Sequence, residues 1–168
     1  MKPGVVDLRI PFNPNAVWLY LSLYLLMPIA PLLMQEREDL LRYARGIVAA
    51  TIVAAIVFIF WPTLCPRPSG NSNAAYQLLT AIDRPLHAFP SLHACFAVYS
   101  ALYARFPFRW LWVALICYGA LATKQHMLVD LIAGSLLGLM AYAFAFRSLN
   151  PPFRNIHENK QTTYCRGL

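Results

Sequence analysis

Long stretches without charged residues are the feature that most constrains how this chain folds. Of its 168 residues, 59% are hydrophobic and 12% are charged, whereas soluble domains average about 25% charged residues. The charge-free stretches are Ala16–Met34, Gly46–Pro66, Pro85–Ala104, Trp110–Thr123 and Leu131–Phe146. The first two reach the roughly 20 residues that a helix needs to cross hydrocarbon, and flanking Tyr, Trp, Arg and Lys extend the others. We therefore predict an all-α fold, a single membrane-embedded domain over residues 1–168 with about five transmembrane helices.

The connection over residues 62–90 is the only long one, and it is rich in Pro, Gly, Ser and Asn. Within it, Ala74–Ile82 is expected to form a short helix that lies at the membrane interface. Loops of this length in compact domains are usually either functional or disordered. Because this loop leads directly into a cluster of polar residues, we favour a functional role.

The basic residues are unevenly distributed, and the formal net charge is +7. If the loops alternate between membrane faces, one face holds nine of the fourteen Lys and Arg residues: Arg37, Arg42, Arg45, Arg105, Arg109, Arg147, Arg154, Lys160 and Arg166. Cytoplasmic loops carry an excess of Lys and Arg. We therefore expect a plasma (inner) membrane protein whose C-terminus is cytoplasmic and whose other face lies outside the cytoplasm. The expected partners are membrane lipids rather than nucleic acid, which requires a basic face with aromatics on a soluble fold.

Two polar clusters lie at the edges of the apolar stretches. One is the Pro-Ser-Leu-His segment that ends at His93, and the other is His126 with Asp130 four residues later. On a helix His126 and Asp130 would share one face, so the carboxylate can orient the imidazole. Two helices of about 22 Å, at ~1.5 Å per residue, would bring His93 and His126 to the same membrane face. Together they would form a nucleophile and an acid for phosphoryl transfer.

A metal site is the alternative for these side chains, because His and carboxylate groups bind zinc or manganese. Its ligands would come from His87, His93, His126, Asp83 and Asp130. Arg84 and Lys124 stand beside these residues and would repel a cation while attracting an anion. We therefore expect no metal and no cofactor, with His87 at the interface or at the rim of the site.

Three short motifs in the sequence indicate a protein family. They are Asp83-Arg84-Pro85, Phe89-Pro90-Ser91-Leu92-His93, and Thr123-Lys124-Gln125-His126 with Asp130. In order and spacing they resemble the type 2 phosphatidic acid phosphatase superfamily. The Leu after Ser91 and the Lys-Gln-His run are most similar to its branch related to inositol phosphorylceramide synthases. The resemblance covers roughly residues 74–140.

The resemblance implies a helical membrane bundle that acts without metal on phosphate esters, often those of lipids. It implies that His126 attacks phosphorus to give a phosphohistidine while Asp130 holds its ring. His93 would be the general acid that protonates the leaving oxygen. Arg84 and Ser91 would bind the phosphoryl oxygens.

Two basic residues of the superfamily pattern are missing from this chain. Gln77 stands where the first motif usually has Lys, so it takes that phosphate-binding position here. Gly119 and Ala120 stand where the third motif usually has Ser and Arg. We expect Lys124 to replace one of the missing cations, with snorkelling toward lipid headgroups as the alternative.

Three classes of function follow. The first is a hydrolase that removes phosphate or diphosphate from a lipid, and the second is a phosphotransferase that passes the phosphoryl headgroup to an alcohol. They differ in whether water or an alcohol resolves the intermediate. The third is a non-catalytic membrane-binding or transport protein with the same fold, against which the presence of His93, His126 and Asp130 argues.

Small residues recur below the two histidines. One stripe, at every fourth residue, consists of His126, Asp130, Gly134 and Gly138, and a second consists of His93, Ala97 and Ala101. Small residues let membrane helices approach closely. The pattern predicts two parallel helices with these small faces in contact.

Overall fold

The structure, a computed structural model, describes residues 3–65, 67–68, 73–83 and 86–147. In this part of the chain the regular elements are all helical, as the sequence predicts. In chain order they are α1 (Val5–Arg9), the 3-10 turn η1 (Pro14–Ala16), α2 (Val17–Leu21), α3 (Leu23–Leu32), α4 (Arg37–Phe60), α5 (Ala74–Ile82), α6 (Leu92–Tyr103), α7 (Arg109–Ala122) and α8 (Leu128–Arg147).

Three helical stretches in the described residues are long and apolar enough to cross a membrane, fewer than the five predicted. They are Pro14–Leu32, Arg37–Phe60 and Leu128–Arg147. The helices α6 and α7 have 12 and 14 residues, so they span about 18 and 21 Å at ~1.5 Å per residue. That is less than the roughly 30 Å of hydrocarbon. The window Pro85–Ala104 overstated α6 because it includes the residues before the Ser91 cap, whereas α7 is about as long as its window and is not extended by the flanking residues.

Asn and Ser side chains mark where two of these helices begin. The Asn73 side chain accepts a hydrogen bond from the Tyr76 amide at 2.8 Å, and α5 has the predicted bounds Ala74–Ile82. The Ser91 hydroxyl accepts one from the Ala94 amide at 3.3 Å, so α6 begins at Leu92. Each cap satisfies one of the amide groups that a helix start leaves without a partner.

The helices α6 and α8 pack in parallel, as predicted, and their backbones touch. A Cβ atom added to Gly134 would collide with the Ser91 carbonyl, and one added to Gly138 would lie 2.5 Å from the Cys95 carbonyl oxygen. Further along, the rings of Tyr99 and Tyr142 lie 6.4 Å apart. The contacts therefore advance by four residues along α6 for every four residues along α8.

The stripe of α6 that faces α8 differs from the one predicted. It runs through Ser91 and Cys95, whereas Ala97 and Ala101 belong to a buried cluster with Leu23, Leu26, Val98, Val113 and Ile116. Those partners come from α3 and α7. His93 thus lies on the side of α6 that faces α2 and α3, away from the glycines.

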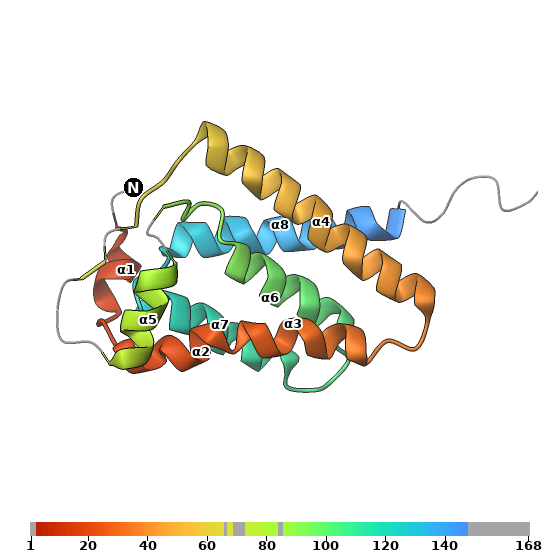
Figure 1. Cartoon of the computed structure of the whole chain (residues 1–168), viewed down its shortest axis with the longest axis horizontal. Helices are drawn as coiled ribbons and strands as arrows, with labels where there is room; N and C mark the ends of the chain where they lie inside the picture. The colour runs from red at the N-terminus through yellow and green to blue at the C-terminus, as the bar shows by residue number, and fades with distance from the viewer. Residues whose placement is uncertain (1–2, 66, 69–72, 84–85, 148–168) are drawn as a thin grey trace, which may run out of the picture.

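The two ends of the bundle are formed by different elements (Figure 1). At one end lie α1, α5 and the connection between α7 and α8. At the other end lie the connections from α3 to α4 and from α6 to α7, together with the end of α8. Arg37, Arg105, Arg109 and Arg147 belong to that second end. The histidines and most of the described arginines are therefore at opposite ends.

Substitution of Gly134 by Ala should destabilise the protein by about 1–3 kcal/mol, because the added methyl forces the two helix backbones apart. Thermal unfolding in detergent measures this as a lower Tm. Leu136→Ala on the same helix is the matched control, since Leu136 is 55% exposed and should change Tm little. Equal stability of the Gly134→Ala protein and wild type would contradict the backbone contact.

Candidate active site

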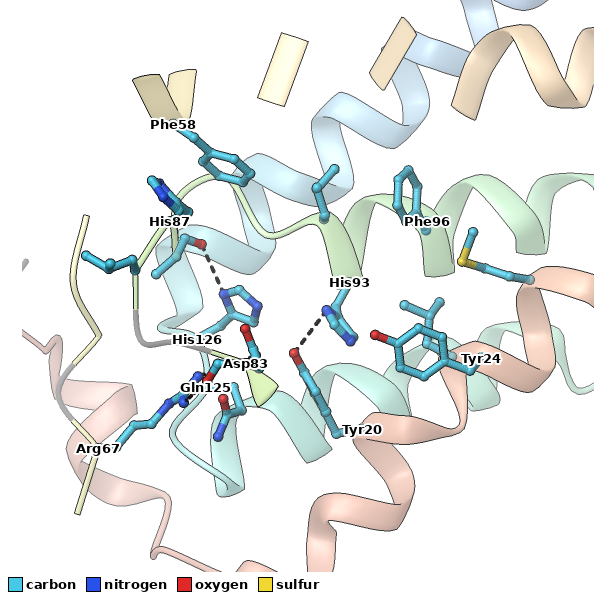
Figure 2. Close-up of a pocket in the computed structure, with 15 residues that line it drawn as sticks. Tyr20, Tyr24, Phe58, Arg67, Asp83, His87, His93, Phe96, Gln125 and His126 are labelled. Atoms are coloured by element: carbon cyan, nitrogen blue, oxygen red, sulfur yellow. Dashed lines mark hydrogen bonds and ion pairs between the residues drawn. The ribbon is translucent and has the colours of Figure 1, made fainter. Parts of the chain in front are cut away.

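A cavity of about 460 Å³ lies at the histidine end of the bundle (Figure 2). Its polar part consists of Arg67, Asp83, His87, His93, Gln125 and His126. Its apolar wall consists of Leu23, Met27, Phe58, Leu92 and Phe96. Residues from α2, α3, α4 and α6 and from three connections therefore converge on one space, with polar groups on one side and apolar side chains on the other.

His126 lies in the turn between α7 and α8 rather than on a helix. The amide of Gln125 donates to the Ala120 carbonyl at 3.0 Å and that of Lys124 to Leu121 at 3.2 Å, while Lys124 adopts a positive φ of 54°. These two bonds with a left-handed residue form a Schellman motif, which ends α7. His126 follows directly, and α8 begins only at Leu128. The prediction that His126 and Asp130 share a helical face is therefore wrong.

The His126 ring is held by a backbone carbonyl. Its Nδ1 lies 3.0 Å from the Ala88 carbonyl oxygen and 4.0 Å from Oδ2 of Asp130. A carbonyl only accepts, so Nδ1 carries the hydrogen in this pair and Nε2 keeps its lone pair. Asp130 is buried, and its Oδ2 accepts the Met127 amide at 2.8 Å. The carboxylate is thus near the ring, but its hydrogen bond goes to the start of α8.

Two bonds position the Ala88 carbonyl. The Ala88 amide donates to the Thr63 carbonyl at 3.3 Å, and the Phe89 amide donates to the Thr63 hydroxyl at 2.8 Å. Leu64 and Leu86 form an isolated antiparallel bridge next to them. The chain after α4 is therefore tied to the segment before α6, which fixes the acceptor of His126.

His93 faces His126 across the cavity. The centroids of the two rings lie 6.0 Å apart. Tyr20 of α2 stacks on His93 with centroids 3.9 Å apart, and its hydroxyl lies 3.0 Å from Nδ1 of His93. Nε2 of His93 is buried without a hydrogen-bond partner. The structure thus brings together the two histidines, which the sequence separates by 33 residues.

Burial lowers the pKa of His126 to about 4. Desolvation is the largest cause, the hydrogen bond to Ala88 opposes it, and the positive charge of Arg67 lowers the pKa further. An imidazole in this environment is neutral at pH 7, and the neutral form is the nucleophile. Burial also raises the pKa of Asp83, which Arg67 counteracts.

Two of the predicted phosphate-binding residues, Lys124 and Ser91, do not line this cavity. Lys124 donates from Nζ to the carbonyls of Asp7 and Ile10 at 2.7 and 2.6 Å, so its charge is directed to the chain around α1. Ser91 is fully buried as the cap of α6, beside Gly134.

Two further predicted positions belong to the first motif. Gln77 is on an exposed part of α5 and is not among the residues that line the cavity. Arg84 lies outside the described residues. His87 lines the cavity at its rim, is exposed, and has its ring 5.2 Å from that of Phe58.

Arg67, Gln125 and Tyr20 line the cavity but were not among the predicted site residues. Nε of Arg67 and Oε1 of Gln125 are buried without partners, as is Nε2 of His93. Buried polar atoms without partners are costly unless a ligand or water satisfies them. A basic residue in the Pro-rich loop on the histidine side was the one available signal for Arg67, whereas nothing in the sequence pattern distinguished Tyr20.

The candidate metal ligands do not form a metal centre. In the described part of the chain, no three His, Cys, Asp or Glu side chains are grouped closely enough to hold a metal ion. The cavity instead combines two imidazoles with a guanidinium, which suits an anion.

The fold and the cavity define a class of membrane-embedded helical protein with two histidines facing one another at one end of the bundle. The sequence profile of the PAP2 superfamily matches residues 9–144, so the chain belongs to this superfamily. Its members are phosphatases or phosphotransferases, in agreement with the family that the three motifs indicated. No curated protein and no solved structure matches the chain.

The low pKa of His126 leads to a pH prediction. The neutral imidazole should predominate down to about pH 4 and be lost as the pH falls through that value. NMR of the protein labelled with ¹³C at histidine Cε1, in detergent and assigned with His126→Gln, measures this titration. A midpoint near the ordinary 6.5 would contradict the buried, carbonyl-bonded ring.

Proposed function

We propose that this protein is an integral-membrane lipid phosphatase that hydrolyses a phosphate monoester or diphosphate of a lipid through a phosphohistidine, without a metal ion. The observation that carries the proposal is the pair of imidazoles 6.0 Å apart in a cavity with one polar and one apolar side. The polar side suits a phosphoryl group, and the apolar side suits the chains attached to it.

The reaction proceeds in two steps. In the first, the lone pair on Nε2 of His126 attacks phosphorus, the bond between phosphorus and the lipid oxygen breaks, and the imidazolium form of His93 gives its proton to that oxygen and becomes neutral. In the second, a water loses a proton to His93 and its oxygen attacks phosphorus, so phosphate leaves and His126 is restored. The Ala88 carbonyl supports this role because it occupies Nδ1 and leaves Nε2 available.

The lipid nature of the substrate is supported by the cavity wall. Met27 comes from α3, Phe58 from α4 and Phe96 from α6, and all three face the same space as the histidines. Hydrocarbon buried there gains about 25 cal/mol per Å². A small polar phosphate ester would leave this wall without a partner.

Transfer of the phosphoryl headgroup to an alcohol is the second candidate, and Gln125 favours it. Its Oε1 is a buried acceptor without a partner in the cavity, so it calls for a hydroxyl or water donor. An acceptor alcohol held there could take the place of water in the second step, as in enzymes of the inositol phosphorylceramide synthase type. The same chemistry at His126 serves both outcomes.

We further propose that the histidine end faces outside the cytoplasm and that the C-terminus is cytoplasmic. The end that carries Arg37, Arg105, Arg109 and Arg147 would then face the cytoplasm, in agreement with the positive-inside rule.

Loss of either histidine should reduce turnover by orders of magnitude. Purified protein in detergent, with EDTA present, is assayed on a panel of lipid phosphates and diphosphates with and without alcohol acceptors. His126→Ala should abolish turnover of every substrate. His93→Ala should harm alkyl phosphates more than p-nitrophenyl phosphate, because p-nitrophenolate leaves without a proton. Asp130→Asn should reduce turnover less than His126→Ala does, since Nδ1 bonds to Ala88.

Three results would count against the proposal. Near-normal turnover by the His126→Ala protein would show that His126 is not the nucleophile. If EDTA abolished activity and added zinc restored it, the metal-free mechanism would be wrong. No turnover of any phosphate ester by wild type would favour the non-catalytic reading. The ratio of free phosphate to phosphorylated alcohol separates hydrolysis from transfer.

Membrane orientation can be tested with single cysteines. Ala74→Cys at the start of α5 should react with an impermeant thiol reagent in intact cells, and Gln35→Cys only after lysis, because both positions are exposed at opposite ends of the bundle. The background carries Cys117→Ser and Cys165→Ser, since Cys65 and Cys95 are buried. The reverse labelling pattern would place the cavity in the cytoplasm.

A further inference from the structure

Two of the cations that usually hold phosphate in this superfamily are missing from this chain, because Gln77 and Ala120 stand at their positions. Gln77 does not line the cavity. Ala120 is fully buried in an apolar cluster with Tyr20, Ala94 and Leu131, where a longer basic side chain has no room. Among the described residues that line the cavity, Arg67 is the only Arg or Lys.

The position of Arg67 follows from the loop that carries it. The bonds of Thr63 to Ala88 and Phe89 hold this loop against the segment before α6. The Arg67 side chain is 12% exposed and points from the loop toward Asp83 and Gln125 (Figure 2). Its charge acts on His126, and both residues also border a second cavity beside α1. The guanidinium and the nucleophile therefore share two spaces.

One edge of the guanidinium is largely free. Nη1 donates to the Asp83 backbone carbonyl, which fixes the plane of the group. Nη2 lies 3.4 Å from Oδ2 of Asp83, a long contact, and Nε is buried without a partner. Nε and Nη2 carry the two parallel N–H groups that Arg offers to a phosphate in bidentate recognition.

We infer that Arg67 binds the phosphoryl oxygens through Nε–H and Nη2–H, in place of the basic residues that the chain lacks at 77 and 120. This inference rests on the proposed phosphoryl-transfer function. The Asp83 carbonyl keeps the guanidinium in place, and the incoming phosphate replaces the long contact to the Asp83 carboxylate. Arg67 is thus a phosphate-binding residue supplied from outside the three motifs.

Orthovanadate, as a mimic of the phosphoryl group in transfer, tests the inference on the purified full chain in detergent. Arg67→Ala should weaken vanadate inhibition at least about tenfold and lower kcat/KM, because a charged hydrogen-bonding pair is lost. Arg67→Lys should be nearly as impaired as Arg67→Ala in vanadate inhibition and kcat/KM, since an ammonium cannot form the two parallel bonds. Added guanidinium chloride should partly restore activity and vanadate inhibition to Arg67→Ala. Arg9→Ala is the matched control, a cation on the same end that is exposed and outside the cavity.

The outcomes separate this inference from the function on which it rests. If wild type is active but Arg67→Ala shows unchanged vanadate inhibition and kcat/KM, Arg67 does not bind phosphate and the phosphatase proposal stands. If Arg67→Ala loses activity together with thermal stability and guanidinium restores neither, Arg67 only holds the loop and the inference is wrong. If wild type binds no vanadate and turns over no phosphate ester, the proposed function itself fails.

Discussion

The contact between α6 and α8 is the constraint on which the site depends. The Ser91 amide donates to the Asp130 carbonyl at 3.1 Å, and Gly134 and Gly138 leave room for the carbonyls of Ser91 and Cys95. Between membrane helices, such close backbone approach replaces the hydrophobic driving force that water would supply. Because Ser91 also caps α6, the same few atoms set where that helix starts and how it meets α8. His93 and the turn with His126 then lie level with each other.

Buried polar atoms without partners destabilise a protein, and in the described residues half of the six such side-chain atoms belong to residues that line this cavity. Nε of Arg67, Nε2 of His93 and Oε1 of Gln125 are all buried without partners on residues that line it. Each such atom costs roughly 1–3 kcal/mol. A bound phosphoryl group with its acceptor supplies acceptors for Arg67 and His93 and a donor for Gln125. A ligand of this chemistry would thus satisfy these atoms when it binds.

The sequence predicted what depends on periodicity and composition, and missed what depends on turns. The all-α class, the bounds of Ala74–Ile82 and the close approach of Gly134 and Gly138 follow from local patterns. The number of long helices did not, because charge-free windows do not mark where a Ser91 cap or a Schellman turn interrupts a helix. That turn uses Lys124 in the left-handed region, where Gly is usual. The position of Arg67 in the cavity depends on a loop pairing with no sequence signature.

The hydrogen-bond partner of His126 bears on how the proposed phosphohistidine would be resolved. A carboxylate bonded to Nδ1 would stabilise the positive charge that the ring gains when phosphorus is attached to Nε2. In this chain Nδ1 bonds to the neutral Ala88 carbonyl, and Asp130 stands at 4.0 Å with its Oδ2 bonded to the Met127 amide. In the proposed mechanism the phosphorylated ring would therefore be less stabilised and would give up its phosphoryl group readily. The product of the proposed reaction would then depend on which hydroxyl reaches His93 first, so the shape and polarity of the cavity around Gln125 would decide between water and alcohol.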